Sequence, residues 1–381
     1  MSRATGALKA LDIVRSPALP RGFDDSERLY LRPIGLVRGP ESAPAIAQGR
    51  AVPLAGGPVA FTACEAYLRA RGRARASVAS VPELLAWRDR LDEAAGRRVR
   101  EWLARLSAKR EPVAGCGSDR PSIMGVVNVT PDSFSDGGLC AAPAAAIAHG
   151  QALAGAGAAI IDVGGESTRP GASPVPEAEE RARVLPVVAA LAAAGLVVSV
   201  DTRNAATMAA ATGRGAAMIN DISALAHQPG SLAAAAASGV PVVLMHSLGD
   251  PGARRAHARY AHAPMDVYDA LARRVDEAVA AGIPHDRIVV DPGIGFAKTA
   301  DHSVQVLRWL SLFHGLGCLL ALGASRKSFI RRLTAEDVPA ARLPGSLAAA
   351  LVGLDQGVQI LRVHDVAATA QAVAVWRAIG A

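Results

Sequence analysis

The sequence predicts an α/β protein, with a (β/α)8 or TIM barrel over residues 119–381 and a smaller N-terminal α+β extension over residues 1–118. From about residue 119, aliphatic runs of strand length alternate with Ala-rich helical stretches, a pattern typical of parallel βαβ units. There are eight such runs in about 260 residues, the number that a closed barrel needs. Each run also ends in a polar residue or cluster.

The eight predicted strands follow one another at regular spacing. They cover residues 122–128, 159–164, 197–202, 217–221, 241–246, 287–292, 318–324 and 359–364. The polar positions that end them are Asn128, residues 162–166, Asp201, Asn220, His246, Asp291, residues 325–327, and Arg362 with His364. Barrels of this kind build their active sites at the C-terminal ends of the strands, so these positions are expected to meet at one mouth.

The front segment has a different pattern. Residues 26–37 predict a short strand, residues 39–58 are rich in Gly, Pro and Ala, and residues 81–111 have helical spacing. This spacing predicts that Trp87 and Trp102 pack against other side chains rather than bind a ligand. The stretch EPVAGCGSDRP, residues 111–121, is typical of a linker between the extension and the barrel.

The net charge of +7 is concentrated in the front segment. Residues 1–115 carry 20 Lys and Arg against 12 Asp and Glu, whereas the rest of the chain carries 21 against 22. The run RARGRAR at 69–75 could meet a nucleic acid or an acidic partner. It has no interleaved aromatic residues and belongs to no recognisable binding module, so the interpretation we favour is a solvated basic face.

Composition also bounds the cellular location. The four cysteines are widely spaced without a CxxC pair, which indicates free thiols rather than disulfides or a zinc site. The most apolar stretch, 184–200, is interrupted by Pro186 and Gly195, so it predicts a helix that runs into a buried strand rather than a membrane span. The chain opens without the apolar core of a signal sequence. We therefore expect a cytoplasmic protein without a membrane partner.

Seven short motifs fall at the predicted strand ends. In chain order they are NVTPDSFSDGG (128–138), ESTRPGA (166–172), SVDTR (199–203), IND (219–221), DPGIGF (291–296), SRKS (325–328) and RVHD (362–365). In this order they resemble the dihydropteroate synthase family, and the resemblance covers residues 119–381. One such motif can arise by chance, but seven in the right order are hard to explain otherwise. The extension shows no motif of known function, so its role stays open.

The resemblance implies a transferase of folate biosynthesis. Such an enzyme joins 6-hydroxymethyl-7,8-dihydropterin pyrophosphate to 4-aminobenzoate and releases pyrophosphate and 7,8-dihydropteroate. A pterin edge presents ring N–H, amine and carbonyl groups, which buried carboxylates and amides can bind. The resemblance assigns this role to Asp201, Asn220 and Asp291, together with Lys327. Without the motifs, a strand-end Asp would more simply be a helix cap or part of a local ion pair.

A leaving pyrophosphate requires cations and oriented donors. The resemblance assigns Asn128 to a Mg²⁺ ion, which prefers oxygen ligands and can bridge phosphate oxygens. Thr168 would donate a hydroxyl hydrogen bond, and Arg362 and His364 would point the same way from one strand. Lys327, Arg362 and His364 form the expected catalytic set. The alternative for Arg362 is an ion pair with an acid such as Asp365. The family's reaction proceeds largely by C–O cleavage before amine attack, so it needs no covalent enzyme intermediate.

The aryl amine site is expected to form late, when loops close over bound pterin. The resemblance implies that Phe134 and Pro170 sandwich the ring while Asp136 and Arg169 order the loops. Ser328 would receive the carboxylate at the start of a helix, with a simple N-cap as the alternative.

Two departures from the family pattern are Ala297, where many relatives carry Gly, and HSLGD at 246–250 in place of an HMQG-like turn. Neither departure removes a proposed ligand.

Two other functions remain possible at this stage. A methyltetrahydrofolate methyltransferase shares the pterin contacts, but its reaction has no pyrophosphate for the SRKS and RVHD motifs to neutralise. A catalytically silent paralogue could bind pterin, or a partner through the extension, although every proposed ligand is present. The resemblance also implies a homodimer formed through barrel helices, and sensitivity to sulfonamides.

Overall fold

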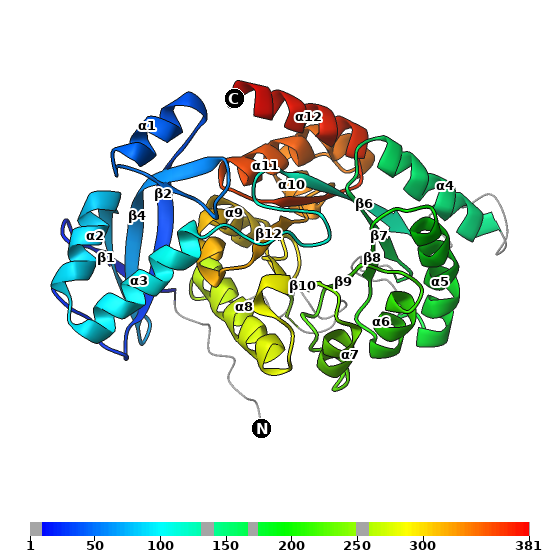
Figure 1. Cartoon of the computed structure of the whole chain (residues 1–381), viewed down its shortest axis with the longest axis horizontal. Helices are drawn as coiled ribbons and strands as arrows, with labels where there is room; N and C mark the ends of the chain where they lie inside the picture. The colour runs from blue at the N-terminus through cyan, green and yellow to red at the C-terminus, as the bar shows by residue number, and fades with distance from the viewer. Residues whose placement is uncertain (1–9, 131–140, 167–173, 249–258, 381) are drawn as a thin grey trace.

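The computed structural model of the chain describes residues 10–130, 141–166, 174–248 and 259–380, and its centre is a closed barrel of eight parallel strands (Figure 1). The strands are β6 (Ser122–Asn128), β7 (Ile160–Gly164), β8 (Val198–Asp201), β9 (Met218–Asp221), β10 (Val242–Met245), β11 (Ile288–Asp291), β12 (Leu319–Leu322) and β13 (Ile360–Val363). They pair in chain order, and β13 closes the barrel on β6. All eight predicted strands are confirmed within two residues.

Helices cover the outside of the barrel. They are α4 (Ala141–Gly155), α5 (Glu177–Ala193), α6 (Ala205–Thr212), α7 (Ser231–Ser238), α8 (Ala263–Ala280), α9 (Ala300–Arg308), α10 (Ser328–Thr334), α11 (Leu343–Asp355) and α12 (Val366–Ile379), with the 3-10 helices η3 (His285–Arg287), η4 (Leu310–Leu316) and η5 (Ala340–Arg342). Helix α5 contains Pro186 and is followed by β8, as predicted for the apolar stretch at 184–200. Across the described parts of the chain, no helix combines the length and apolarity needed to span a bilayer.

The barrel interior has two layers. Side chains alternate between the inside and outside of a strand, so every second residue points inward. The lower layer is apolar and consists of Met124, Ile160, Met218, Val243, Val289, Leu319, Ala321 and Ile360. The upper layer, at the C-terminal strand ends, is polar and includes Asp162, Ser199, Asp201, Asn220, Asp291 and Arg362. The fold therefore places its polar interior at one end of the barrel only.

The predicted linker at 111–121 forms the floor of the barrel. The backbones of Val113 and Cys116 hydrogen-bond to each other in both directions, at 2.8 Å, and so form a tight turn. Both side chains are buried and belong to the same cluster as the apolar lower layer. The segment connects two parts of the chain and also closes the N-terminal end of the barrel.

The extension is a five-stranded sheet of order β1-β5-β4-β2, in which β3 also pairs with β4. Its strands are β1 (Asp12–Arg15), β2 (Arg28–Arg38), β3 (Val52–Pro53), β4 (Val59–Ala70) and β5 (Arg73–Ser80), and its helices are α1 (Ser42–Ala47), α2 (Val81–Arg90) and α3 (Glu93–Ser107), with the 3-10 helix η1 (Gly39–Glu41). Strand β2 matches the predicted strand. The sequence pattern did not reveal β4 and β5, because they are rich in Ala, a weak strand former.

Local capping explains why the predicted helical stretch is two helices. Ser80 and Glu83 form a reciprocal capping box that starts α2, with a hydrogen bond from the Ser80 backbone N–H to the Glu83 carboxylate at 2.7 Å. The Asp92 carboxylate then accepts a hydrogen bond from the Ala95 N–H at 2.8 Å and starts α3. The chain turns between these two starts, and α2 packs on α3.

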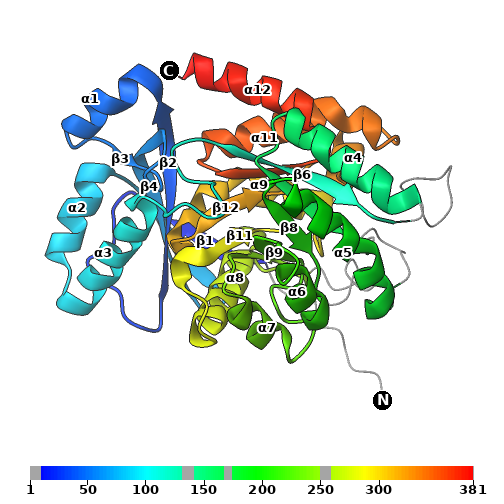
Figure 2. The same ribbon diagram turned by 45° about the vertical axis from the view of Figure 1, so that its right-hand side comes forward.

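The extension packs against one side of the barrel, next to α8 and η4 (Figures 1 and 2). The indole of Trp102 stacks on the ring of Tyr268 in α8, with the ring centres 5.2 Å apart. It also fills the space above Gly315, where an added Cβ would lie 2.0 Å from the indole. Both Trp87 and Trp102 are buried, which confirms that they are packing residues.

Charged side chains add to this contact. Arg69 pairs with Asp266 at 2.6 Å, and Arg28 pairs with Asp269 at 2.9 Å, both at α8. At the other end of the extension, Arg38 donates to the Trp376 carbonyl of α12 at 2.7 Å. The basic run at 69–75 therefore docks the extension through Arg69, while its exposed residues fit the predicted solvated face.

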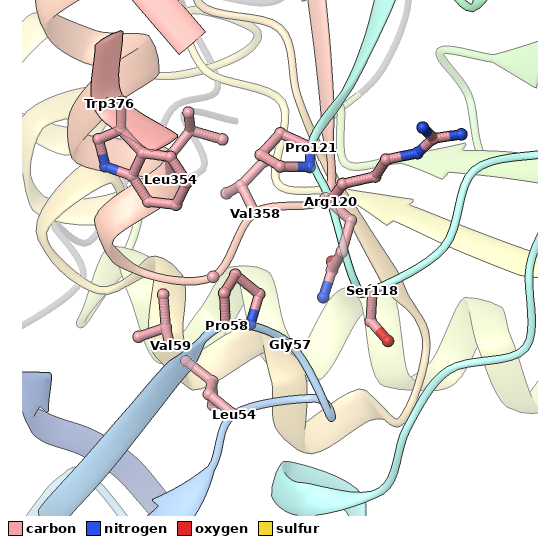
Figure 3. A pocket seen from close by; sticks show the side chains of 12 residues that line it. Leu54, Gly57, Pro58, Val59, Ser118, Arg120, Pro121, Leu354, Val358 and Trp376 are labelled. Carbon is pink, nitrogen blue, oxygen red and sulfur yellow. The ribbon is translucent and has the colours of Figure 1, made fainter. Parts of the chain in front are cut away.

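A small crevice marks the junction at the N-terminal end of the barrel, and Figure 3 shows it. It lies between Leu54 and Pro58 of the extension, Pro121 just before β6, and Val358 and Trp376 of the barrel. None of the predicted site residues lines it, and it is at the opposite end from the polar layer. Among the described cysteines, Cys64, Cys116 and Cys318 are buried and free, as predicted, while Cys140 lies outside the described residues.

Candidate active site

The polar strand ends converge at the C-terminal mouth of the barrel. Parallel pairing sets Asn128 opposite Gly164, Gly164 opposite Asp201, and Asp201 opposite Asn220. The ring is completed by Asp291 from β11, Lys327 after β12, and Arg362 with His364 from the end of β13. The structure thus brings together seven of the residues predicted from the sequence: Asn128, Asp201, Asn220, Asp291, Lys327, Arg362 and His364.

Arg362 is the centre of a buried charge network. Its Nε donates to Asp162 Oδ2 and its Nη2 to Asp201 Oδ2, each at 2.6 Å. Asn220 Nδ2 donates to the same Asp162 oxygen at 3.0 Å. The alternative partner considered for Arg362, Asp365, pairs instead with Arg326 at 2.8 Å. Arg362 is therefore paired, but with acids across the barrel.

The charge on Asp201 depends on its neighbours. Burial raises the pKa of Asp201, the Arg362 guanidinium opposes this rise, and the nearby charge of Asp162 adds to it. The same two carboxylates raise the pKa of Arg362. The guanidinium thus limits the rise only in part, and the pKa of Asp201 is raised to about 7, so this carboxyl titrates close to neutral pH.

Asp291 and Lys327 lie together on the other side of the mouth. Asp291 Oδ1 accepts from the Gly293 N–H at 2.7 Å, which orients the carboxylate. A Cβ added to Gly323 would lie 3.4 Å from Asp291 Oδ2, 3.6 Å from Lys327 Nζ and 3.9 Å from Arg362 Cβ. Asp291, Lys327 and the start of the Arg362 side chain therefore lie close together around Gly323.

A buried lysine holds the loop that follows β11. Lys298 Nζ donates to the carbonyls of Gly293 and Phe296, at 2.9 and 3.2 Å, and lies 2.9 Å from His246 Nδ1. Lys327 contacts the same loop, because its Nζ donates to the Ile294 carbonyl at 2.7 Å and lies 4.4 Å from the centre of the Phe296 ring. Lys298 therefore holds the backbone of this loop, and the loop in turn holds the Lys327 ammonium group through the Ile294 carbonyl.

Ala297, in this loop, adopts a left-handed backbone with φ of +46°. This conformation explains why glycine suits the position, since a Cβ in that region costs about 1–2 kcal/mol. We expect Ala297→Gly to stabilise the protein by about 0.5–1 kcal/mol, measured by urea unfolding. The matched control is Ala270→Gly inside α8, which should destabilise by about 1 kcal/mol. A destabilised Ala297→Gly variant would contradict this interpretation.

His364 is a neutral imidazole in this environment. Burial, together with the nearby Arg362 and Arg326 charges, lowers the pKa of His364 to about 4. Its Nδ1 lies 3.1 Å from the Ser325 hydroxyl. If Ser325 donates that hydrogen bond, Nε2 carries the proton and can donate to an anion at neutral pH.

Ser328 is the first residue of α10, while Lys327 occupies the N-cap position, so the N-cap alternative for Ser328 is wrong. It borders an open cavity of about 530 Å³ beside the mouth, together with Lys298, Arg331 and Arg332. Asp337 lines the same cavity and pairs with Arg331, and burial lowers the pKa of Lys298 well below its ordinary value. The positive charge of this wall therefore comes mainly from Arg332, which favours an anionic group there.

Five predicted residues, Phe134, Asp136, Thr168, Arg169 and Pro170, lie outside the described residues. The second loop begins within the described part at Glu166, which pairs with Arg203 at 3.0 Å. The mouth also contains Gly323, which the sequence did not single out, and Asp162, which was predicted to lie at a polar strand end but was given no role. A role for Asp162 could have been expected from its position, because an acid between Ile161 and Val163 in a buried strand has to point into the barrel.

A parallel barrel with carboxylates, an amide and cations at its C-terminal mouth is typical of α/β-barrel enzymes that bind a polar, anionic substrate. Comparison with known proteins identifies the class. The family described as "Pterin binding enzyme" matches residues 124–364. The dihydropteroate synthase of Neisseria meningitidis serogroup C is 44% identical over 267 residues, which are 69% of this chain and 94% of the relative.

Solved structures agree with this match. A Xanthomonas albilineans dihydropteroate synthase with 4-aminobenzoic acid is 47% identical, with a TM-score of 0.67 over 72% of this chain and 98% of that chain. A Yersinia pestis dihydropteroate synthase in complex with a sulfonamide drug is 42% identical, with a TM-score of 0.67 over 71% and 98%. The chain belongs to the pterin-binding enzymes and, among them, to the dihydropteroate synthases. Its activity is transfer of a pterinylmethyl group. More than a quarter of this chain has no counterpart in these two structures.

Proposed function

We propose that the mouth described above binds 6-hydroxymethyl-7,8-dihydropterin pyrophosphate with the pterin ring between Asp201, Asn220 and Asp291. The observation that carries this proposal is the gathering of Asp201, Asn220 and Asp291 at the C-terminal end of the barrel, with Lys327 next to Asp291. Oxygens of Asp201 and Asp291 accept hydrogen bonds from ring N–H and amine groups, while Lys327 donates to a ring acceptor. These are the donors and acceptors that a pterin edge presents.

The pyrophosphate is bound on the side of Arg362 and His364. Cleavage of the C–O bond leaves its electron pair on pyrophosphate and a positive charge that the methylene shares with the pterin ring. Arg362 stabilises the developing phosphate charge, and the neutral His364 donates a hydrogen bond to it. The amine of 4-aminobenzoate then forms the new C–N bond and loses a proton to solvent. Asp201 and Asp291 favour the cationic pterin through their negative charge.

Asn128 is the proposed Mg²⁺ ligand. It ends β6 at the mouth and offers a neutral amide oxygen, a hard ligand that suits this ion together with phosphate oxygens and water. When bound, the ion would supply positive charge to the leaving pyrophosphate. Thr168 would donate a hydroxyl hydrogen bond on the same side.

The 4-aminobenzoate is proposed to bind beyond the pterin, with its carboxylate at Ser328 and its ring between Phe134 and Pro170. Asp136 and Arg169 would order the closing loops. The Arg332 side chain, which lines the same cavity as Ser328, supports this placement because its charge favours a carboxylate at the rim. Sulfonamides, which mimic the shape and charge of this substrate, should compete for the same position.

The homodimer is also proposed, with α11 and α12 as its contact. Val375 and Ile379 lie one turn apart on α12 and are 55% and 71% exposed, and Val352 on α11 is 48% exposed. Apolar side chains exposed on packed neighbouring helices favour burial against a second copy. Sedimentation velocity would test this, and a monomer at micromolar concentration would exclude it.

The proposed function is tested by turnover with both substrates. We expect the purified protein with Mg²⁺ to release pyrophosphate only when both the pterin pyrophosphate and 4-aminobenzoate are present, and to form dihydropteroate in equal amount. A sulfonamide should raise the KM for 4-aminobenzoate and leave kcat unchanged, as expected for a competitor. Properly folded protein that gives no product would refute the enzymatic reading. Methyl transfer from a methylated folate would support the methyltransferase alternative.

A further inference from the structure

We propose that Asp162 is a positioning residue of this site, which holds Arg362 and Asn220 in the orientations that bind the pterin pyrophosphate. The proposal rests on the function proposed above, because it takes Arg362 and Asn220 as substrate contacts. Asp162 itself does not reach the substrate space, since its side chain is completely buried in the barrel interior. It acts through the two residues that it holds.

The contacts come from three separate strands. Asp162 lies on β7, Asn220 on β9 and Arg362 on β13. A single carboxylate oxygen, Asp162 Oδ2, accepts both the Arg362 Nε hydrogen bond at 2.6 Å and the Asn220 Nδ2 hydrogen bond at 3.0 Å. Asp162 thereby couples the pyrophosphate side of the mouth to the pterin side.

Folding alone does not account for this acid. A buried carboxylate loses its hydration, and a well-packed apolar side chain is usually at least as stable. Asp162 Oδ1 has no hydrogen-bond partner in the described part of the chain, and neither has the hydroxyl of Ser199, its register partner on β8. A buried carboxylate with one unsatisfied oxygen costs stability. The two donors that it does bind, on Arg362 and Asn220, therefore indicate that its role is to orient these side chains.

The contact fixes what Asn220 presents to a ligand. A carboxylate oxygen can only accept, so the amide nitrogen of Asn220 has to face Asp162. The amide oxygen is then turned the other way and can accept a hydrogen bond from a ring N–H or amine. Without Asp162 the amide could rotate, and a donor would face the donors of the pterin.

The contact also fixes how Arg362 faces the phosphates. With Nε held by Asp162 and one hydrogen of Nη2 held by Asp201, the plane of the guanidinium is set by two carboxylates. Its Nη1 makes no hydrogen bond to the described residues, and it remains available to an anion. Arginine binds phosphate well only when its planar fork is oriented, so this restraint prepares it for the leaving group.

The test compares Asp162→Asn, Asp162→Ala and the control Ser199→Ala. In Asp162→Asn the amide oxygen can replace Oδ2, and the amide nitrogen takes the place of the unsatisfied Oδ1. We expect its kcat/KM for the pterin pyrophosphate to stay within about 5-fold of the wild type. In Asp162→Ala both donors lose their acceptor, so kcat/KM should fall about 10-fold to 150-fold. Ser199→Ala, buried on the next strand, should be close to the wild type.

Two further readouts separate positioning from folding. Calorimetry with inorganic pyrophosphate and with the pterin pyrophosphate should show weaker binding of both in Asp162→Ala and restored binding in Asp162→Asn. The acid limb of the kcat/KM profile should move to lower pH in Asp162→Asn, because Asp201 loses a neighbouring negative charge that raises its pKa. The other charged groups near Asp201 are Arg362, Asp221 and Glu180, and they are unchanged.

Several outcomes would overturn the proposal. They are an Asp162→Ala variant that binds both ligands normally, equal losses in Asp162→Asn and Asp162→Ala, or an unmoved acid limb. If Asp162→Ala does not fold, the proposal is tested with the near-isosteric Asp162→Asn alone, through the pH dependence of its kcat/KM. A wild-type protein without turnover refutes the proposed function instead, and this is seen before any variant is compared.

Discussion

Replacing Arg362 by alanine is expected to reduce turnover by about 100-fold to 1000-fold and to destabilise the protein by about 3–5 kcal/mol. The variant loses its contact with the leaving pyrophosphate. It also leaves Asp162 and Asp201 as buried acids without their cation, since both are held by the guanidinium at 2.6 Å. Turnover is measured by pyrophosphate release and stability by urea unfolding at pH 7.5.

The stability loss should depend on pH in a defined direction. Burial already raises the pKa of Asp201 above its ordinary value of 3.8, and removing Arg362 raises it further. A carboxyl with a raised folded pKa binds its proton more tightly in the native state, so its contribution to stability is lost as the pH rises from its unfolded to its folded pKa. The variant should therefore be closest to the wild type near pH 5 and furthest from it near pH 8.

Arg326→Ala provides the matched control. Arg326 and Asp365 form an ion pair just outside the ring, with side chains 30% and 18% exposed. Breaking a partly solvated pair should cost about 1 kcal/mol or less, because water replaces the lost partner. If Arg362→Ala is no less stable than Arg326→Ala, or if its stability does not depend on pH, Arg362 does not stabilise the buried charges of Asp162 and Asp201 as proposed here.

Removing the extension is expected to have the second large effect, on stability rather than on chemistry. A protein that begins at Arg120 lacks Trp102, so the ring of Tyr268 and the surface around Gly315 become exposed to solvent. Losing one buried Trp alone costs about 3–5 kcal/mol, a large part of the stability of a typical domain. We expect the shortened protein to unfold at least 10 °C lower and to aggregate, while its soluble fraction still binds the pterin pyrophosphate.

A second truncation tests the floor segment. A protein that begins at Glu111 keeps Val113 and Cys116 under the barrel, so it should be more stable than one that begins at Arg120. In the full-length chain, Trp102→Ala should reproduce much of the loss, and Arg97→Ala on the exposed face of α3 should not. A soluble, folded barrel that does not bind the pterin pyrophosphate would show that the extension belongs to the active site.

The barrel could be predicted from the sequence because its signals are local. Each strand is an apolar run that stops at a polar residue, as Asn128 stops β6 and Asp291 stops β11. The structure confirms these strands and gathers their ends as expected. The strands of the extension were harder to predict, since β4 is rich in Ala and contains the charged residues Glu65 and Arg69.

Contacts between distant residues could not be read in the same way. From the sequence, Arg362 was expected to bind phosphate, and an ion pair with a nearby acid such as Asp365, three residues away, was the alternative. The actual partners, Asp162 and Asp201, are 200 and 161 residues away in the chain. Closure of the barrel brings these residues together, and a local sequence pattern cannot predict contacts between residues so far apart in the chain. Similarly, the Gly and Pro content of residues 111–121 predicts a linker but cannot show that Val113 packs beneath the barrel.

The floor segment has a kinetic consequence. Because Val113 and Cys116 close the barrel from below, the described structure offers substrates a route from the mouth only. The proposed pterin contacts, such as Asn220, lie at the strand ends, whereas Ser328 lies at the rim on α10. In a pocket with one entrance, the ligand that binds deeper has to enter before the ligand that binds near the entrance. If the substrates bind as proposed, we therefore expect the pterin substrate to bind first and 4-aminobenzoate to bind second.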